Sequence, residues 1–126
     1  MQKEEKKETK KQIIKVDSNE VISYVLLADR DLPEDKRDVY KIKNPSGLLL
    51  VKAVGKPLEE QLNLKFEECL KDWIKKDRKG NVIPFPVIAG KIDTNKVFEI
   101  LSLDNTTEIL HVINNFSEVA QDFLIR

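Results

Sequence analysis

Few of the residue types that carry chemistry occur in this chain. Its 126 residues include one cysteine, one histidine and one tryptophan. A single cysteine excludes an internal disulfide, and a lone thiol fits a reducing compartment. One cysteine and one histidine are also too few for a zinc site, which needs several such ligands at set spacings. Neither GxxxxGKS/T nor GxGxxG occurs, so nucleotide binding has no support. The sequence predicts no metal and no cofactor.

Net charge is missing as well. Lysine plus arginine and aspartate plus glutamate both total 22, which leaves a formal charge of 0. Binding to phosphates normally needs a basic excess or stripe, so this balance argues against nucleic acid as the main partner. No apolar run approaches the length of a membrane span, and the N-terminus lacks the apolar region of a signal peptide. We expect a cytoplasmic origin and no membrane partner.

The charged N-terminus is set apart from the rest of the chain. Residues 1–12 are almost entirely Lys, Glu, Gln and Thr, with no apolar residue after Met1. Such a segment cannot pack, so we predict a disordered tail. The apolar pattern begins at Ile13. Residues 13–126 are long enough for one small domain with a modest core.

Two short segments after the tail have the composition of β-strands. Residues 21–28 (VISYVLLA) are rich in β-branched and aromatic side chains, and residues 39–42 (VYKI) alternate. Asp17 with Glu20 could instead cap a helix here. A turn that contains Pro33 joins the two segments. We predict an antiparallel pair of strands across this turn.

The middle of the chain is apolar. Residues 48–54 (LLLVKAV) could form a short helix capped by Ser46 or a buried strand. After Pro57, which suits the start of a helix, apolar residues recur at intervals of three and four. We predict one amphipathic helix that packs on the strands and ends before a turn at residues 79–81, where Gly80 supplies a positive φ. The apolar face contains Leu58, Leu62, Phe66, Cys69, Leu70, Trp73 and Ile74.

The C-terminal part predicts short packed helices. Thr94 can cap a helix to about Leu101, and Ser117 can cap a last helix over residues 118–126. Asn105 with Glu108 resembles a capping box for a helix that ends near Asn114. The fold class that follows is α+β, with short antiparallel strands near the N-terminus packed on a predominantly helical C-terminal part. The side chains expected to point inward are Val97, Phe98, Leu101, Ile109, Leu110, Val112, Ile113, Val119, Phe123 and Leu124.

Cys69 and His111 are the only candidates for a thiol nucleophile and its base. Cys69 lies in the predicted apolar face, where a thiol behaves as a small hydrophobe. A catalytic thiol needs an electropositive and partly exposed setting. We therefore interpret Cys69 as a core residue and His111 as a residue at or near the surface.

Two clusters of acidic residues also lack the features of a catalytic or calcium-binding site. Four carboxylates gather in the exposed turn before residue 39, without the burial that would separate their pKa values for acid–base catalysis. The residues near Gly80 lack the aspartate spacing and the closing glutamate of a calcium loop. We predict that the protein is not an enzyme. The residues concerned are Asp29, Asp31, Glu34 and Asp35 in the first group, and Asp72 and Asp77 in the second.

Several short motifs resemble those of small tailed-bacteriophage proteins encoded among virion morphogenesis genes. They are residues 24–33 (YVLLADRDLP), residues 39–42 (VYKI), and Trp73 followed by residues 77–85 (DRKGNVIPF) before a helical C-terminus. The chain departs from the family at residues 44–54, where a very apolar run follows the polar capping segment. The resemblance implies a structural or assembly role in the head, neck or tail, and it implies no catalytic residue.

Other protein subunits of a phage particle or assembly intermediate are therefore the expected partners, and self-association into a homo-oligomer is an open alternative. The expected location is the virion or the host cytoplasm. Strand edges within residues 21–42 and the apolar segment 83–85 are the expected contact elements. The residues expected to bind a partner are Tyr24, Leu26, Arg30, Leu32, Pro33, Tyr40, Ile83 and Phe85.

Two other functions are compatible with the sequence. One is a tail assembly chaperone that is absent from the finished particle. The other is a small cytoplasmic regulatory or anti-host-defence protein. A Cys–His hydrolase ranks last, for the reasons given above.

Overall fold

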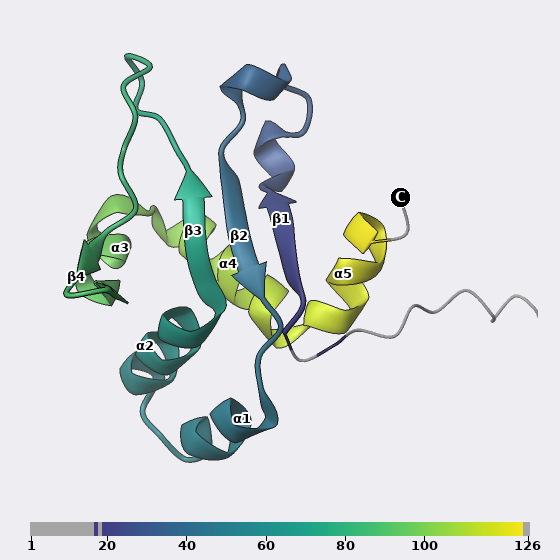
Figure 1. Ribbon diagram of the computed structural model, residues 1–126, viewed down its shortest axis with the longest axis vertical. Helices are drawn as coiled ribbons and strands as arrows, with labels where there is room; N and C mark the ends of the chain where they lie inside the picture. Colours follow the sequence, from purple (N-terminus) through teal and green to yellow (C-terminus); the bar gives the residue numbers. More distant parts are fainter. Residues whose placement is uncertain (1–16, 18, 125–126) are drawn as a thin grey trace, which may run out of the picture.

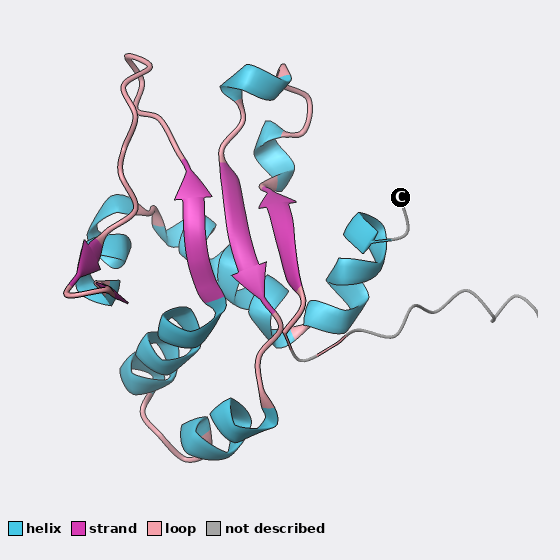
Figure 2. Cartoon of the chain, in the orientation of Figure 1, coloured by secondary structure: helices cyan, strands magenta, loops and turns pink. Residues whose placement is uncertain are grey.

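The computed structural model describes residue 17 and residues 19–124 (Figure 1). The predicted tail lies outside these residues, as do residues 13–16 and the last two residues of the predicted final helix. In the described part, a three-stranded antiparallel sheet in the order β1-β2-β3 is combined with helices that dominate the C-terminal part (Figure 2). The fold class is α+β, as the sequence predicts.

The first two strands pair as predicted. Strands β1 (Val21–Val25) and β2 (Val39–Lys43) are antiparallel, with Tyr24 opposite Tyr40. Because side chains alternate along a strand, every second residue of both strands faces the core. No helix capped at Asp17 is found among the described residues, since β1 begins at Val21.

Strand β1 ends three residues earlier than the predicted boundary at Ala28. The Leu27 N–H donates a hydrogen bond to a carboxylate oxygen of Glu108 at 2.9 Å, and the chain turns there into a 3₁₀ segment, η2 (Leu27–Asp29). A second 3₁₀ segment, η3 (Glu34–Lys36), follows before β2. The contact with Glu108 is distant in sequence, so local composition does not show it.

Of the two predictions for residues 48–54, the short helix is confirmed. Helix α1 spans Gly47–Ala53. Ser46 caps it, because its side-chain oxygen accepts a hydrogen bond from the Leu49 N–H at 3.1 Å. The helix is short, and its buried residues are Leu49 and Ala53.

The predicted helix over residues 58–74 is wrong in its second part. Helix α2 spans Leu58–Cys69, and the chain then continues as strand β3 (Leu70–Ile74), which pairs antiparallel with β2. Leu58 and Ile74 were expected on the buried face, yet they are 67% and 56% exposed.

A β-bulge explains why β3 has helical spacing in the sequence. The register of β2 against β3 shifts between Lys41 and Ile42, which makes Lys71 an extra residue in β3. Leu70 and Trp73 are therefore both buried, although they lie three residues apart. A regular strand buries residues two apart, and a spacing of three is typical of a helix.

The turn after β3 contains the predicted positive φ, at Gly80 (φ 86°). It joins β3 to an extended return segment rather than a helix to a strand. The Asp77 carboxylate accepts hydrogen bonds from the N–H groups of Lys79 and Asn81. Beyond the turn, the Ile83 N–H donates to the Lys75 carbonyl at 2.8 Å. The return segment therefore pairs with the residues that directly follow β3.

A small hairpin follows that the sequence does not predict. Its strands are β4 (Val87–Ile88) and β5 (Lys91–Ile92). The two residues of the turn, Ala89 and Gly90, have φ values of 53° and 80°. Two positive φ values are what a tight two-residue hairpin turn requires.

Three helices complete the described part of the chain, as predicted: α3 (Thr94–Ile100), α4 (Leu103–Asn114) and α5 (Phe116–Leu124). Their starts differ from the prediction. The caps of α3 and α4 are Asp93 and Ser102, each of which accepts a backbone hydrogen bond three residues on. The predicted caps Thr94, Asn105 and Ser117 lie inside the helices instead.

The core lies on one side of the sheet. Helix α4 crosses behind the sheet, α5 lies beside β1, and α3 lies beyond β3 (Figure 1). Of the side chains predicted to point inward from the last helices, about half are fully buried and most of the others pack partly against the core. Trp73 is buried between Tyr40 and Phe85, with edge-to-face ring contacts to both. The largest fully buried side chains are Tyr40, Phe66, Ile42, Leu70, Ile109, Ile113, Val97, Val112 and Cys69.

Candidate protein-binding surface

Three of the eight residues predicted to bind a partner lie in the core. Tyr24, Leu26 and Tyr40 are buried, so they are not available to a partner while the chain is folded. The Tyr24 hydroxyl donates a hydrogen bond to the Glu108 carboxylate. Burial, and then this bond to a negative group, raise the pKa of Tyr24. Tyr24 therefore joins β1 to α4, which is a structural role.

The three predicted residues in the β1–β2 connection have different surroundings. The Arg30 guanidinium lies 5.3 Å from the ring centroid of Tyr24 and 5.8 Å from that of Phe123. Arg30 thereby holds the connection against β1 and α5. Leu32 and Pro33 are exposed, and both are available for contact.

The last two predicted residues, Ile83 and Phe85, pack within the fold and are partly buried. Ile83 is partly buried against the core, and its carbonyl accepts a hydrogen bond from the Trp73 indole N–H at 2.8 Å. The Phe85 ring packs edge-to-face on Trp73 at 5.2 Å. The apolar segment 83–85 therefore supports Trp73 first of all. The structure does not bring the eight residues together on one surface.

A different group of apolar residues is strongly exposed around helix α1. We call it the α1 patch. Its five large side chains are between 55% and 78% exposed. They come from α1 itself and from the connection to the start of α2 (Figure 1). Exposed apolar groups of this size mark binding surfaces more often than scattered single residues do. The members are Leu48, Leu50, Val51, Val54 and Leu58.

The patch exists because α1 is apolar on more sides than it can bury. An amphipathic helix needs one apolar stripe, which Leu49 and Ala53 provide four residues apart. The same short helix also contains apolar residues at positions 48, 50 and 51, and these face away from the core. The run LLLV has more apolar side chains than a single buried stripe needs, but the sequence does not show which of them are exposed.

Helix α1 is firmly held in position. Glu68 of α2 accepts hydrogen bonds from the Ser46 N–H at 2.7 Å and from the Ser46 hydroxyl at 3.1 Å. The Lys43 ammonium lies 3.6 Å from the same carboxylate. Burial by itself would raise the pKa of Glu68, but the bonds from Ser46 and the charge of Lys43 outweigh it and lower that pKa. Helix α1, which carries most of the patch, is therefore held in a fixed position relative to α2.

A shallow groove runs between α1 and α2 beside the patch. Its volume is about 560 Å³. Its lining combines the apolar residues Val51, Val54 and Leu64 with the polar residues Lys52, Lys56, Glu60 and Asn63. Protein-binding surfaces likewise combine apolar with polar residues.

In the described part, the candidate reactive side chains do not lie together at one site. Cys69 is fully buried, and burial is the main reason that its pKa is raised to about 12. His111 is exposed on α4. Across residues 17 and 19–124, no three His, Cys, Asp or Glu side chains are placed to hold a metal ion. None of the helices in that part is long and apolar enough to cross a membrane.

Comparisons with protein-family models, with curated proteins and with solved structures found no match for this chain.

Proposed function

We propose that this chain is a non-enzymatic protein-binding subunit, and that its partner docks on the α1 patch. The strong exposure of five large aliphatic side chains on a firmly held helix supports this proposal. Fully burying one such side chain contributes about 1.5–3 kcal/mol. Partial burial of all five side chains would contribute several kcal/mol, which offsets part of the free-energy cost of association. A protein surface with complementary apolar groups is the partner that fits.

The resemblance to phage morphogenesis proteins supplies the biological setting of the proposal. In that setting the chain is a structural protein of a bacteriophage virion, in the head, neck or tail, and it binds other subunits of the particle. It would be found in the virion or in the host cytoplasm. The run LLLVKAV (residues 48–54), in which the chain departs from the family pattern, contains four of the five patch residues.

A tail assembly chaperone is the second candidate. It would use the same patch on assembly intermediates and then leave. A cytoplasmic regulatory or anti-host protein would instead hold a host protein there. All three candidates share the α1 patch as binding surface, and they differ in the identity of the protein bound.

Site-specific crosslinking in the producing cells tests the proposal. A photoreactive amino acid is placed at Val51 in the full-length chain, and a control is placed at Asn95, an exposed residue of α3. Mass spectrometry then identifies the captured protein. A particle subunit crosslinked from Val51 and recovered in purified virions supports the structural role. The same capture in assembly intermediates alone supports the chaperone, and capture of a host protein supports the regulatory role.

A pair of matched variants tests the surface itself. Val51→Asp with Val54→Asp should weaken capture about tenfold or more, which corresponds to about 1.4 kcal/mol. Val87→Asp with Ile88→Asp changes two aliphatic residues in the β4–β5 hairpin that are 53% and 64% exposed, and it should leave capture unchanged. Equal capture by both variants and the unchanged chain would show that the α1 patch is not the docking surface.

A further inference from the structure

One face of the β-sheet is uncovered in the described structure. Among residues 17 and 19–124, no helix or strand lies over the side of the sheet opposite α4 (Figure 1). We call it the open face. Val21 and Ile74 on it are 43% and 56% exposed. Its residues are Val21, Ser23, Val25, Val39, Lys41, Lys43, Lys71, Asp72 and Ile74.

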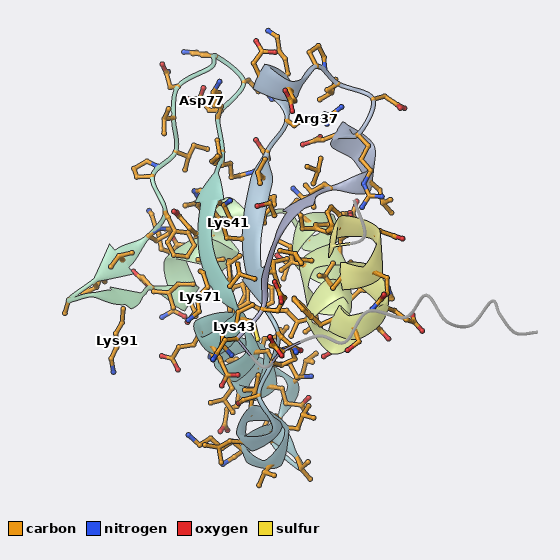
Figure 3. All side chains as sticks on the ribbon, turned by 45° about the vertical axis from the view of Figure 1, so that its right-hand side comes forward. Arg37, Lys41, Lys43, Lys71, Asp77 and Lys91 are labelled. Atoms are coloured by element: carbon orange, nitrogen blue, oxygen red, sulfur yellow. The ribbon has the colours of Figure 1, made fainter. Side chains whose placement is uncertain are left out.

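Lysines dominate the charge of the open face. Figure 3 shows Lys41, Lys43 and Lys71 along the sheet and Lys91 on the neighbouring hairpin. Lys71 and Lys91 line the same hollow beside β3. The Lys71 side chain is exposed, whereas the Lys43 ammonium is paired with the Glu68 carboxylate at 3.6 Å. The acidic member of the face, Asp72, accepts a hydrogen bond from the backbone N–H of Trp73 at 2.8 Å.

The C-terminal helices have the opposite charge. Residues 93–124, which contain α3, α4 and α5, include six acidic residues and one lysine. Glu99, Asp104 and Glu118 are exposed, and Leu103 beside Asp104 is 81% exposed. We call this surface the acidic helical face. The formal charge of 0 therefore conceals an excess of acidic residues in the C-terminal helices.

We propose that the open face binds the acidic helical face of a second copy of this chain. Opposite charges meet in this arrangement, and Leu103 can pack on the aliphatic residues of the sheet. Two open faces cannot pair well, because their lysines would be brought together. The contact is therefore head-to-tail, and a repeated head-to-tail contact gives a ring or an open filament. This inference uses surfaces separate from the α1 patch and goes beyond the proposed function.

The size of the open face limits the strength of one contact. Three strands of five residues offer less area than the roughly 800 Å² per partner of a standard interface. We expect a dissociation constant of about 0.1–1 mM for a single contact. Since exposed charges contribute, association should weaken as salt rises from about 0.05 M to about 0.5 M. Repeated contacts within an assembly would raise the overall affinity.

Charge reversal on the full-length chain tests the head-to-tail geometry, with sedimentation velocity over a concentration series as the measurement. Lys41→Glu with Lys71→Glu should weaken self-association about tenfold or more. Asp104→Lys with Glu118→Lys should do the same from the other side. An equimolar mixture of these two variants should associate again, because the intact open face of one meets the intact acidic helical face of the other and the two reversed faces are also complementary. The chain carrying all four substitutions should associate again. Thermal melts confirm that each variant is folded.

Several outcomes would overturn the proposal. One is a wild-type chain that stays monomeric to about 1 mM at low salt. Another is a mixture of the two variants that associates no better than either alone. A monomeric chain that binds a short DNA duplex through Lys41 and Lys71 would assign the open face to nucleic acid instead. The variant Val51→Asp with Val54→Asp should self-associate normally, so failure of this inference and failure of the proposed function are separable.

Discussion

At the scale of single residues, Cys69 gives the most direct test of the core. Its side chain is fully buried, and burial raises the pKa of its thiol to about 12. The thiol is therefore protonated at about pH 8, and a thiolate is the form that reacts with disulfide reagents. We expect no reaction with such a reagent in the folded protein and immediate reaction in denaturant. Rapid labelling of the folded chain at neutral pH would contradict this and would revive a Cys–His hydrolase.

Ala89 is the one described residue other than glycine with a positive φ, at 53°. The left-handed conformation costs an alanine roughly 1–2 kcal/mol, and glycine avoids this cost while losing some chain entropy. Ala89→Gly should therefore stabilise the protein by about 0.5–1 kcal/mol, measured by urea unfolding.

Gly90→Ala is the matched control in the same turn. Its φ is 80°, and a Cβ there would meet nothing within 4 Å, so the cost is conformational. We expect a loss of roughly 1–2 kcal/mol. Equal stability of both variants and the unchanged chain would show that the hairpin turn is not held in this conformation.

At the scale of elements, the capping of α1 by α2 predicts a dependence on pH. The pKa of Glu68 is lowered by folding, so its contribution is present above the unfolded value of about 4.3 and is lost as pH falls through the lower folded value. Glu68→Gln should cost about 1 kcal/mol at neutral pH. The difference from the unchanged chain should shrink toward zero in acid. Urea unfolding across this pH range measures it.

Glu67→Gln provides the control for this test. Glu67 is the neighbouring carboxylate on α2, and it is exposed. Its removal should change stability by less than about 0.5 kcal/mol at any pH. If Glu67→Gln and Glu68→Gln behave alike, the bonds to Ser46 do not stabilise α1.

Elements with a local signal could be predicted from the sequence, and elements formed by distant contacts could not. Alternation in β1 and β2 and the periodicity of the C-terminal helices were sufficient for their prediction. Strand β3 was missed because its bulge at Lys71 imitates helical spacing, and only pairing with β2 distinguishes the two. The early end of β1 depends on Glu108, which lies 81 residues away from Leu27.

At the scale of the whole molecule, the candidate site was predicted less well than the fold. Tyr24 and Tyr40 were predicted to bind a partner because strand edges within residues 21–42 were the expected contact elements, yet both side chains occupy inward positions of an alternating strand and are buried. The α1 patch was missed because exposure depends on which helices pack over α1. A run of apolar residues does not by itself show how many of its sides find a partner.

The exposed patch and the absent net charge together predict low solubility near the sequence pI of about 6.6. Proteins without net charge lack the repulsion that keeps molecules apart, and apolar surface then promotes association. Val51→Lys with Val54→Lys removes two patch residues that are 71% and 78% exposed, so it should raise solubility at this pH with little change in thermal midpoint. Asn95→Lys with Thr107→Lys adds the same charge at exposed polar positions elsewhere. The patch variant should be the more soluble of the two, as measured by precipitation with polyethylene glycol. Equal gains would show that charge alone limits solubility and that the α1 patch is not adhesive.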